Sequence, residues 1–202
     1  MNPRVLRRFI MLLFIAGMIV GAGTIFYDTF FDRPPGDYEA ERGDMFLSDG
    51  DHAQALDLFN QALHASPDHR GALMGRAVVF METGRRDEAE AELNYLIDFL
   101  NRTLIKDDLT GRGALAAAHA NRGILRDRDG HYQKALDDYI EALRVDGDAV
   151  SGPRLIDKIL HDPRPSTVRD RAKYLYKELQ KPEAERLLRI PELDAKSRTY
   201  KP

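Results

Sequence analysis

The sequence contains no cysteine and no tryptophan among its 202 residues. The lack of cysteine excludes disulfide bonds, thiolate metal sites, cysteine nucleophiles and a lipid-modified cysteine anchor. Its six histidines are scattered without metal-ligand spacing, and neither a glycine-rich phosphate loop nor a Gly-x-Ser-x-Gly elbow occurs. We therefore predict a protein that is not an enzyme, with no catalytic residues, no metal, no cofactor and no small-molecule substrate.

Basic charge is not in excess either, because the formal net charge is -3. This balance argues against nucleic acid as a partner. With 43% hydrophobic and 31% charged residues, the composition is typical of a folded chain. The charge is unevenly placed: residues 34–110 carry 7 Lys/Arg against 16 Asp/Glu, whereas residues 111–202 carry 19 against 15. Different faces of the molecule are thus suited to different contacts, or are simply solvated helix surfaces.

The segment from Phe9 to Tyr27 contains no charged residue over 19 positions. As a helix it would be about 28 Å long, close to the hydrocarbon thickness of a bilayer. Arg4, Arg7 and Arg8 precede it, and positive charge favours the cytoplasmic side. We predict a single transmembrane helix in a bacterial inner membrane, with a cytoplasmic N-terminus and the remaining chain in the periplasm.

Two further interpretations of this segment stay open. A cut after the small residues 21–23 would make the segment a signal peptide and the mature protein soluble in the periplasm. If the helix is retained, Gly17 and Gly21 are one turn apart and could pack closely against another membrane helix. Glycine is also frequent in membrane helices without such a role.

A helix–turn–helix pattern recurs three times in the rest of the sequence. Each copy has a glycine at its turn, and an alanine, a large apolar residue and another small or apolar residue follow at offsets of five, nine and twelve. These positions are Gly50, Ala55, Phe59 and Ala62; Gly84, Ala89, Leu93 and Leu96; and Gly130, Ala135, Tyr139 and Ala142. Glycine permits the left-handed conformation that ends a helix. The later positions form one apolar stripe on the second helix of each pair.

This pattern resembles the tetratricopeptide repeat family, whose unit has 34 residues. The family's small residue in the first helix corresponds to Gly43, Ala77 and Gly123, each preceded by an arginine (Arg42, Arg76 and Arg122). The family's aromatic residue is present as Phe46 and Phe80, but Arg126 replaces it in the third unit, and the expected early tryptophan is missing throughout. The resemblance implies an all-α solenoid of three such units, at 36–69, 70–103 and 116–149, preceded by the single transmembrane helix.

About twelve extra residues separate the second and third units. We expect the helix before them to continue through Leu104 or Ile105, and a loop to occupy 106–113. The domain boundaries predicted are 1–33 for stub, membrane helix and linker, 34–161 for the repeats with a capping helix at 150–161, and 162–202 for C-terminal helices and an extended tail. Within that last part we expect one helix that ends at Gln180 and a last helix near Leu188 that starts at Pro182.

First helices of successive units line the concave face of such solenoids. We expect a partner-binding groove lined by these residues: Asp37, Glu41, Asp44, Leu47, Met74, Val78, Met81, Asn121, Ile124, Asp127 and Arg128. Its acidic, methionine-containing lining would suit a basic and apolar partner segment. The alternative is that some of these residues only pack between repeats.

Together these features predict a membrane-anchored scaffold for protein–protein interaction, acting in assembly or stabilisation of a multisubunit membrane complex on the periplasmic side. Its partners would be subunits of that complex. The alternatives are a stoichiometric accessory subunit of such a complex, or a soluble periplasmic peptide-binding module after signal cleavage.

Overall fold

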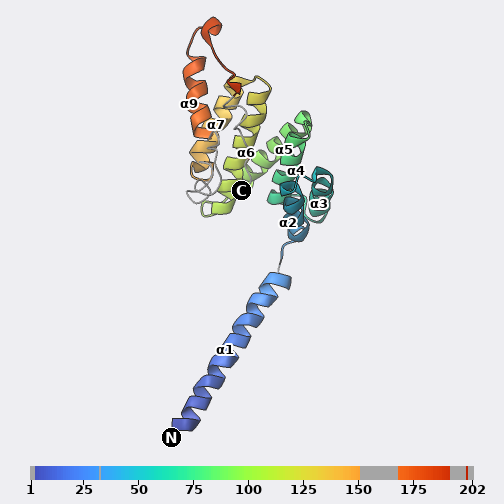
Figure 1. The fold of residues 1–202 in the computed structure, drawn as a ribbon, viewed down its shortest axis with the longest axis vertical. Helices are drawn as coiled ribbons and strands as arrows, with labels where there is room; N and C mark the ends of the chain where they lie inside the picture. The colour runs from blue at the N-terminus through green and yellow to red at the C-terminus, as the bar shows by residue number, and fades with distance from the viewer. Residues whose placement is uncertain (1–2, 32, 151–167, 192–198, 200–202) are drawn as a thin grey trace.

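The computed structural model describes residues 3–31, 33–150, 168–191 and 199, and within this part the regular structure is entirely helical. The helices follow the chain as α1 (Pro3–Phe31), α2 (Asp37–Ser48), α3 (His52–Ala65), α4 (Arg70–Glu82), α5 (Arg86–Thr103), α6 (Leu109–Arg128), α7 (Tyr132–Asp146) and α9 (Val168–Leu179), with a short 3-10 turn at Glu183–Glu185 (Figure 1). The predicted all-α solenoid is confirmed.

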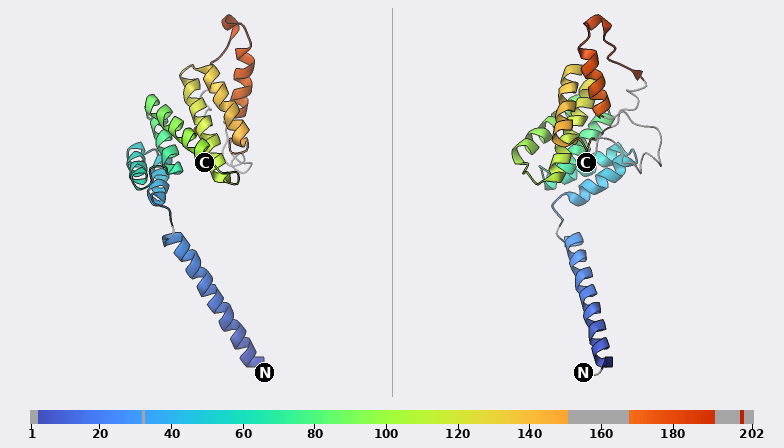
Figure 2. Two further views of the ribbon diagram at one scale, coloured as in Figure 1. Left: turned by 180° about the vertical axis from the view of Figure 1, so that it is seen from behind. Right: turned by 90° about the vertical axis from the view of Figure 1, so that its left-hand side faces the viewer.

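Helix α1 extends away from the other helices, as two further directions of view also show (Figure 2). Its stretch Leu6–Gly23 has a mean hydropathy of 1.8, and none of it is buried within the protein. Large apolar side chains such as Phe9, Phe14 and Ile19 are exposed around the helix. A helix that is apolar all round needs an apolar environment, so α1 could be a membrane span or a signal sequence.

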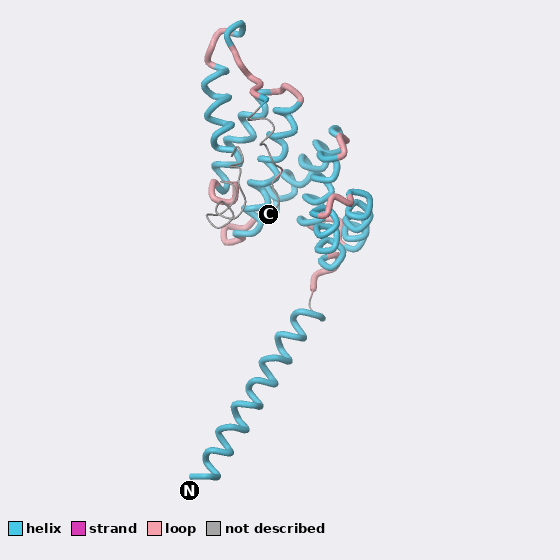
Figure 3. Tube along the Cα trace, in the orientation of Figure 1, coloured by secondary structure: helices cyan, strands magenta, loops and turns pink. Residues whose placement is uncertain are grey.

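Three helical hairpins follow, formed by α2 and α3, α4 and α5, and α6 and α7 (Figure 3). The predicted turn glycines Gly50, Gly84 and Gly130 all adopt positive φ, at 79°, 76° and 82°. A side chain at such a position would be strained, whereas glycine closes the first helix and lets the chain reverse within three residues.

Consecutive hairpins stack on one another, because α3 packs against α4 and α5 packs against α6. The first helices are also in contact, α2 with α4 and α4 with α6. Phe59 is fully buried between the first two units. A Cβ added at Gly43 would lie 2.6 Å from the Phe59 ring, and one added at Gly75 would lie 2.2 Å from it. In the third unit the Tyr139 ring fills the same space beside Gly123, at 2.7 Å. Because these glycines have no side chain, the aromatic rings of the second helices can pack against the first helices.

The loop within the insertion between the second and third units is shorter than predicted. Helix α5 ends at Thr103, and α6 already begins at Leu109, so the loop is 104–108 rather than 106–113. Asp108 explains the early start, since its carboxylate accepts a hydrogen bond from the Gly111 N–H at 2.7 Å and caps α6. The remaining extra residues lengthen α6 to 20 residues.

Beyond α7 the chain adds α9, whose Val168, Ala172 and Leu175 are buried in the same core as the repeats. The capping helix expected at 150–161 lies, except for Val150, outside the described residues. The helix expected near Leu188 is wrong: the 3-10 turn ends at Glu185. Side chains of α9 hold the following chain in a non-helical path, because Glu178 accepts from the Leu187 N–H and Arg171 donates to the Leu188 carbonyl.

Candidate partner-binding surface

An arginine on the first helix joins each later unit to the one before it. Arg76 of α4 donates to both carboxylate oxygens of Glu92 in its own unit, and to the Asn60 side-chain oxygen of the preceding unit at 2.9 Å. Arg122 of α6 repeats the arrangement with Asp138 of its own unit and with Asn94 of the preceding unit, at 2.6 Å. The planar guanidinium has enough donors to serve both partners at once.

The third unit adds further charge around the Asp138 carboxylate, which is only 3% exposed. Arg126 donates to it at 2.8 Å and also pairs with Glu90 of α5. Burial by itself would raise the pKa of Asp138, but the hydrogen bonds from His119 and Arg122 and the charges of Arg122 and Arg126 outweigh burial and lower it. Asp138 is therefore a charged structural anchor between α6 and α7.

The structure buries much of the groove predicted along the first helices. Six of its residues belong to the core, with little or no exposed surface: Leu47, Met74, Val78, Met81, Asn121 and Ile124. The Asn121 amide donates to the Met74 sulfur at 3.3 Å, which joins α4 to α6. For these six the interpretation as exposed groove lining is wrong, because they are buried in the core. For Met74 and Asn121 the contact between α4 and α6 shows inter-repeat packing.

The other five predicted residues remain at least partly exposed. Asp37 binds His69 at 2.7 Å, and Glu41 binds Arg33 at 2.9 Å. Asp127 accepts two hydrogen bonds from Arg171, each 2.7 Å long, while the Arg128 carbonyl accepts from Arg189. Asp44 is half-exposed on α2. These residues do not converge on one site, and a partner-binding role for them stays a prediction.

A different surface is open at the first unit. Tyr38 and Met45 of α2 are 54% and 64% exposed. The corresponding residues of the second unit, 34 positions later, are Ala72 and Val79, which are 0% and 1% exposed. In the third unit Ala118 and Leu125 are equally buried. We call the surface formed by Tyr38, Arg42 and Met45 the leading face, since in later units it packs on the preceding unit.

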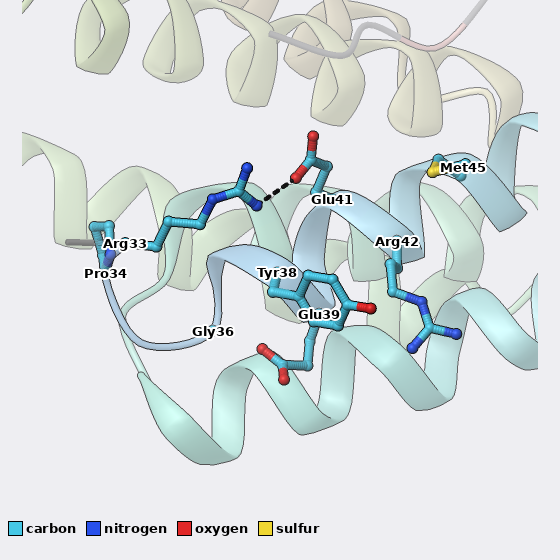
Figure 4. Close-up of a pocket in the computed structure, with 8 residues that line it drawn as sticks. All are labelled: Arg33, Pro34, Gly36, Tyr38, Glu39, Glu41, Arg42 and Met45. Carbon is cyan, nitrogen blue, oxygen red and sulfur yellow. Dashed lines mark hydrogen bonds and ion pairs between the residues drawn. The ribbon is translucent and has the colours of Figure 1, made fainter. Parts of the chain in front are cut away.

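The leading face borders two shallow hollows that share Arg42. One, of about 580 Å³, lies between α2 and the linker at its N-terminus (Figure 4). The other, of about 370 Å³, extends to α3, where Ala53, Asp57 and Leu58 line it. The Arg42 guanidinium lies 5.5 Å from the centre of the Tyr38 ring. It makes no hydrogen bond or ion pair with any residue that the structure describes, unlike Arg76 and Arg122.

Sequence reasoning missed the leading face, although the repeat alignment contains a signal for it. In the later units the position of Tyr38 holds Ala72 or Ala118 and that of Met45 holds Val79 or Leu125, and no described unit precedes the first. The terminal repeats of solenoids usually have polar outer faces, which keep their ends soluble. An exposed tyrosine and methionine at such an end therefore indicate a surface for interaction with another molecule.

These paired helices, turn glycines and stacked units define an α-solenoid, a class of fold used for protein recognition. The tetratricopeptide repeat family model matches residues 46–99. The chain therefore contains tetratricopeptide repeats in this segment, as its recurrent small residues and turns indicated.

Solved structures are similar in fold. The first tetratricopeptide domain of Spaghetti (RPAP3), solved with the HSP90 peptide SRMEEVD, is 15% identical, with a TM-score of 0.51 over 73% of this chain and 94% of that domain. The tetratricopeptide domain of Sgt2 from Aspergillus fumigatus is 17% identical, with a TM-score of 0.47 over 74% of this chain and 87% of that one. No curated protein sequence matches the chain significantly.

Proposed function

We propose that this protein is a non-catalytic scaffold that binds other proteins through its repeat domain and is held at a bacterial inner membrane by α1. The observation that carries the proposal is the combination of a protein-recognition solenoid with a separate helix whose apolar surface is unburied. A bilayer would cover that surface, since each large apolar side chain gains about 1.5–3 kcal/mol on leaving water. Arg4, Arg7 and Arg8 favour a cytoplasmic N-terminus and a periplasmic repeat domain.

Anchoring supports a role in the assembly or stabilisation of a multisubunit membrane complex. A tethered domain meets membrane-bound partners at a much higher effective concentration than a free one does. The linker between α1 and α2 is short and contains Pro34 and Pro35, so the repeats stay close to the end of α1. A partner within the same membrane is therefore the target that this arrangement favours.

The anchor is tested by expressing the full chain in a Gram-negative bacterium with alkaline phosphatase fused to the C-terminus. The proposal expects phosphatase activity, which requires export to the periplasm, together with retention in the membrane pellet after alkaline carbonate washing. Mass spectrometry of the purified chain should find Arg4 to Arg8 still attached. A mature chain that begins after Gly23 and washes off the membrane would instead select the soluble periplasmic module.

A further inference from the structure

On the leading face of the first unit, Arg42 lacks both kinds of partner that the equivalent arginines of the later units have. Arg76 and Arg122 each bind an acidic residue 16 positions later, in their own second helix. For Arg42 that position is Leu58. They also bind Asn60 and Asn94 of the preceding unit, whereas no described unit precedes Arg42. Among the described residues, its guanidinium thus has neither an acidic partner in its own unit nor a hydrogen-bond acceptor from a preceding unit.

Nearby acidic groups do not replace these partners in the described structure. Glu41 is bound to Arg33 at 2.9 Å, and Asp57 accepts from Gln61 at 2.8 Å. Glu39 lines the same hollow but makes no ion pair with Arg42 among the described contacts. An exposed, uncompensated cation beside an exposed tyrosine and methionine is a combination that a charged, amphipathic partner would match.

The later units show what kind of element fits this face. In the second unit the element packed on this face is α3, and in the third unit it is α5. Each of these α-helices packs along the first helix of the next unit and presents an asparagine side-chain oxygen to its arginine. We propose that the leading face binds a helix of another protein, one that presents a carboxylate to Arg42 and apolar residues to Tyr38 and Met45. The carboxylate is required because Arg42, unlike Arg76 and Arg122, has no acidic residue at the equivalent position of its own unit.

In a second copy of this chain, the described helices equivalent to α3 and α5 do not offer that chemistry. The surfaces of α3 and α5 that carry Asn60 and Asn94 already pack on α4 and α6. On α7 the equivalent position is the apolar Ile140, and α9 packs against this helix. These surfaces are not available for the face, which favours a helix from a different protein as its occupant.

The hollow beside Arg42 is also lined by Arg33, Pro34 and Gly36 of the linker (Figure 4). A helix bound there would lie next to the C-terminal end of α1. If α1 is the membrane anchor proposed above, the partner helix lies near the membrane surface, as a periplasmic segment of a membrane protein would. The inference rests on the proposed function for this location, but not for the chemistry of the face.

Site-specific photocrosslinking of the full chain in its native membranes tests this proposal. The photoreactive amino acid p-benzoylphenylalanine replaces Met45, and in a matched control it replaces Ile140, which is 46% exposed on α7. We expect a crosslink from position 45, absent from position 140, to a helical segment of another protein that contains Asp or Glu. Arg42→Gln should lower its yield by about tenfold, the size expected for loss of one hydrogen bond to a charged group, whereas Lys106→Gln in the exposed loop should not.

A product with twice the mass of this chain would overturn the proposal, because the occupant would then be a second copy. So would a crosslink that Arg42→Gln leaves unchanged, or the lack of any protein crosslink above that of position 140. Circular dichroism of each variant confirms that it is folded, and Arg42→Lys, which keeps the charge, should retain part of the yield. If affinity purification still recovers a partner while position 45 does not crosslink, the proposed function stands and this inference alone fails.

Discussion

Gly75 shows how one absent side chain sets the fit between the first two units. The Phe59 ring from α3 enters the space beside it, so that a Cβ at position 75 would lie 2.2 Å from the ring. Glycine inside a helix normally costs about 1 kcal/mol relative to alanine. Here the close packing of a large aromatic residue offsets that cost.

We predict that Gly75→Ala destabilises the protein by about 1–3 kcal/mol, since the ring must move from its place in the stack. Gly113→Ala is the matched control, because it also lies within a helix but its Cβ would be 3.9 Å from the nearest atom. That variant should be neutral or stabilised by up to about 1 kcal/mol. Urea unfolding measures both, and a stabilised Gly75→Ala variant would contradict the packing described.

Asp138 shows what a buried charge contributes at the same scale. It accepts hydrogen bonds from Arg122 and Arg126, so its replacement by asparagine would leave two guanidinium groups poorly compensated. Breaking a buried ion pair from one side typically costs about 3–5 kcal/mol. We predict a loss of this order for Asp138→Asn, measured by urea unfolding at pH 7. A loss below about 1 kcal/mol would mean that the cluster is not a structural anchor.

The same carboxylate makes stability depend on pH. Because its pKa is lower in the folded state than the value of about 3.9 in the unfolded chain, its contribution is complete above that value. The contribution is lost as the pH falls through the folded-state pKa. We therefore predict that the difference in unfolding free energy between the native protein and Asp138→Asn shrinks as the pH falls below about 4. A difference that grows toward acid would have the wrong sign.

At the scale of the element, Asp108 determines where α6 begins and how it joins α4. One of its oxygens accepts from the Gly111 N–H, and the other accepts from Arg70 at 2.5 Å. The hydrogen bond from Gly111, followed by that from Arg70, lowers the pKa of Asp108. The N-terminal ends of two first helices are thus tied together across the inserted loop.

We predict that Asp108→Ala lowers the thermal unfolding midpoint and speeds amide hydrogen exchange in the first turn of α6. The neighbouring Asp107→Ala, an exposed aspartate with no described partner of this kind, is the control and should leave both unchanged. Equal effects of the two substitutions would show that capping by Asp108 does not define the start of the helix.

The helices themselves were predictable because their signals are local. Turn glycines, the apolar stripe and the recurrent small residues each act within one hairpin, and the hairpins form where those signals place them. The loop at 104–108 was mispredicted because the Gly111 and Gly113 pair suggests a loop, whereas the Asp108 cap and the contact with Arg70 extend the helix across them. The helix expected near Leu188 is absent because Arg171 donates to the Leu188 carbonyl and the Leu187 N–H donates to Glu178. No local sequence pattern reveals these hydrogen bonds.

At the scale of the whole molecule, exposure depends on how the units stack. Met74, Val78 and Ile124 have the same residue types that an exposed apolar groove would have, and only the closeness of α4 and α6 decides that they are covered. Conversely, Tyr38 and Met45 are open only because no described unit precedes the first. Periodicity predicts which residues face a neighbour, but it does not say whether that neighbour is part of the chain.

The most direct test of the account is affinity purification in mild detergent of the full-length protein beside a variant lacking residues 1–33. Helix α1 contributes no buried surface over Leu6–Gly23, so its removal should leave the repeat domain folded. Quantitative mass spectrometry compares the proteins recovered with each form. The account predicts that the shortened form recovers the same membrane-complex subunits in lower yield, because recognition resides in the repeats and the anchor raises local concentration. Recovery of partners by the full-length protein alone would contradict this, and would place the interface on the membrane helix.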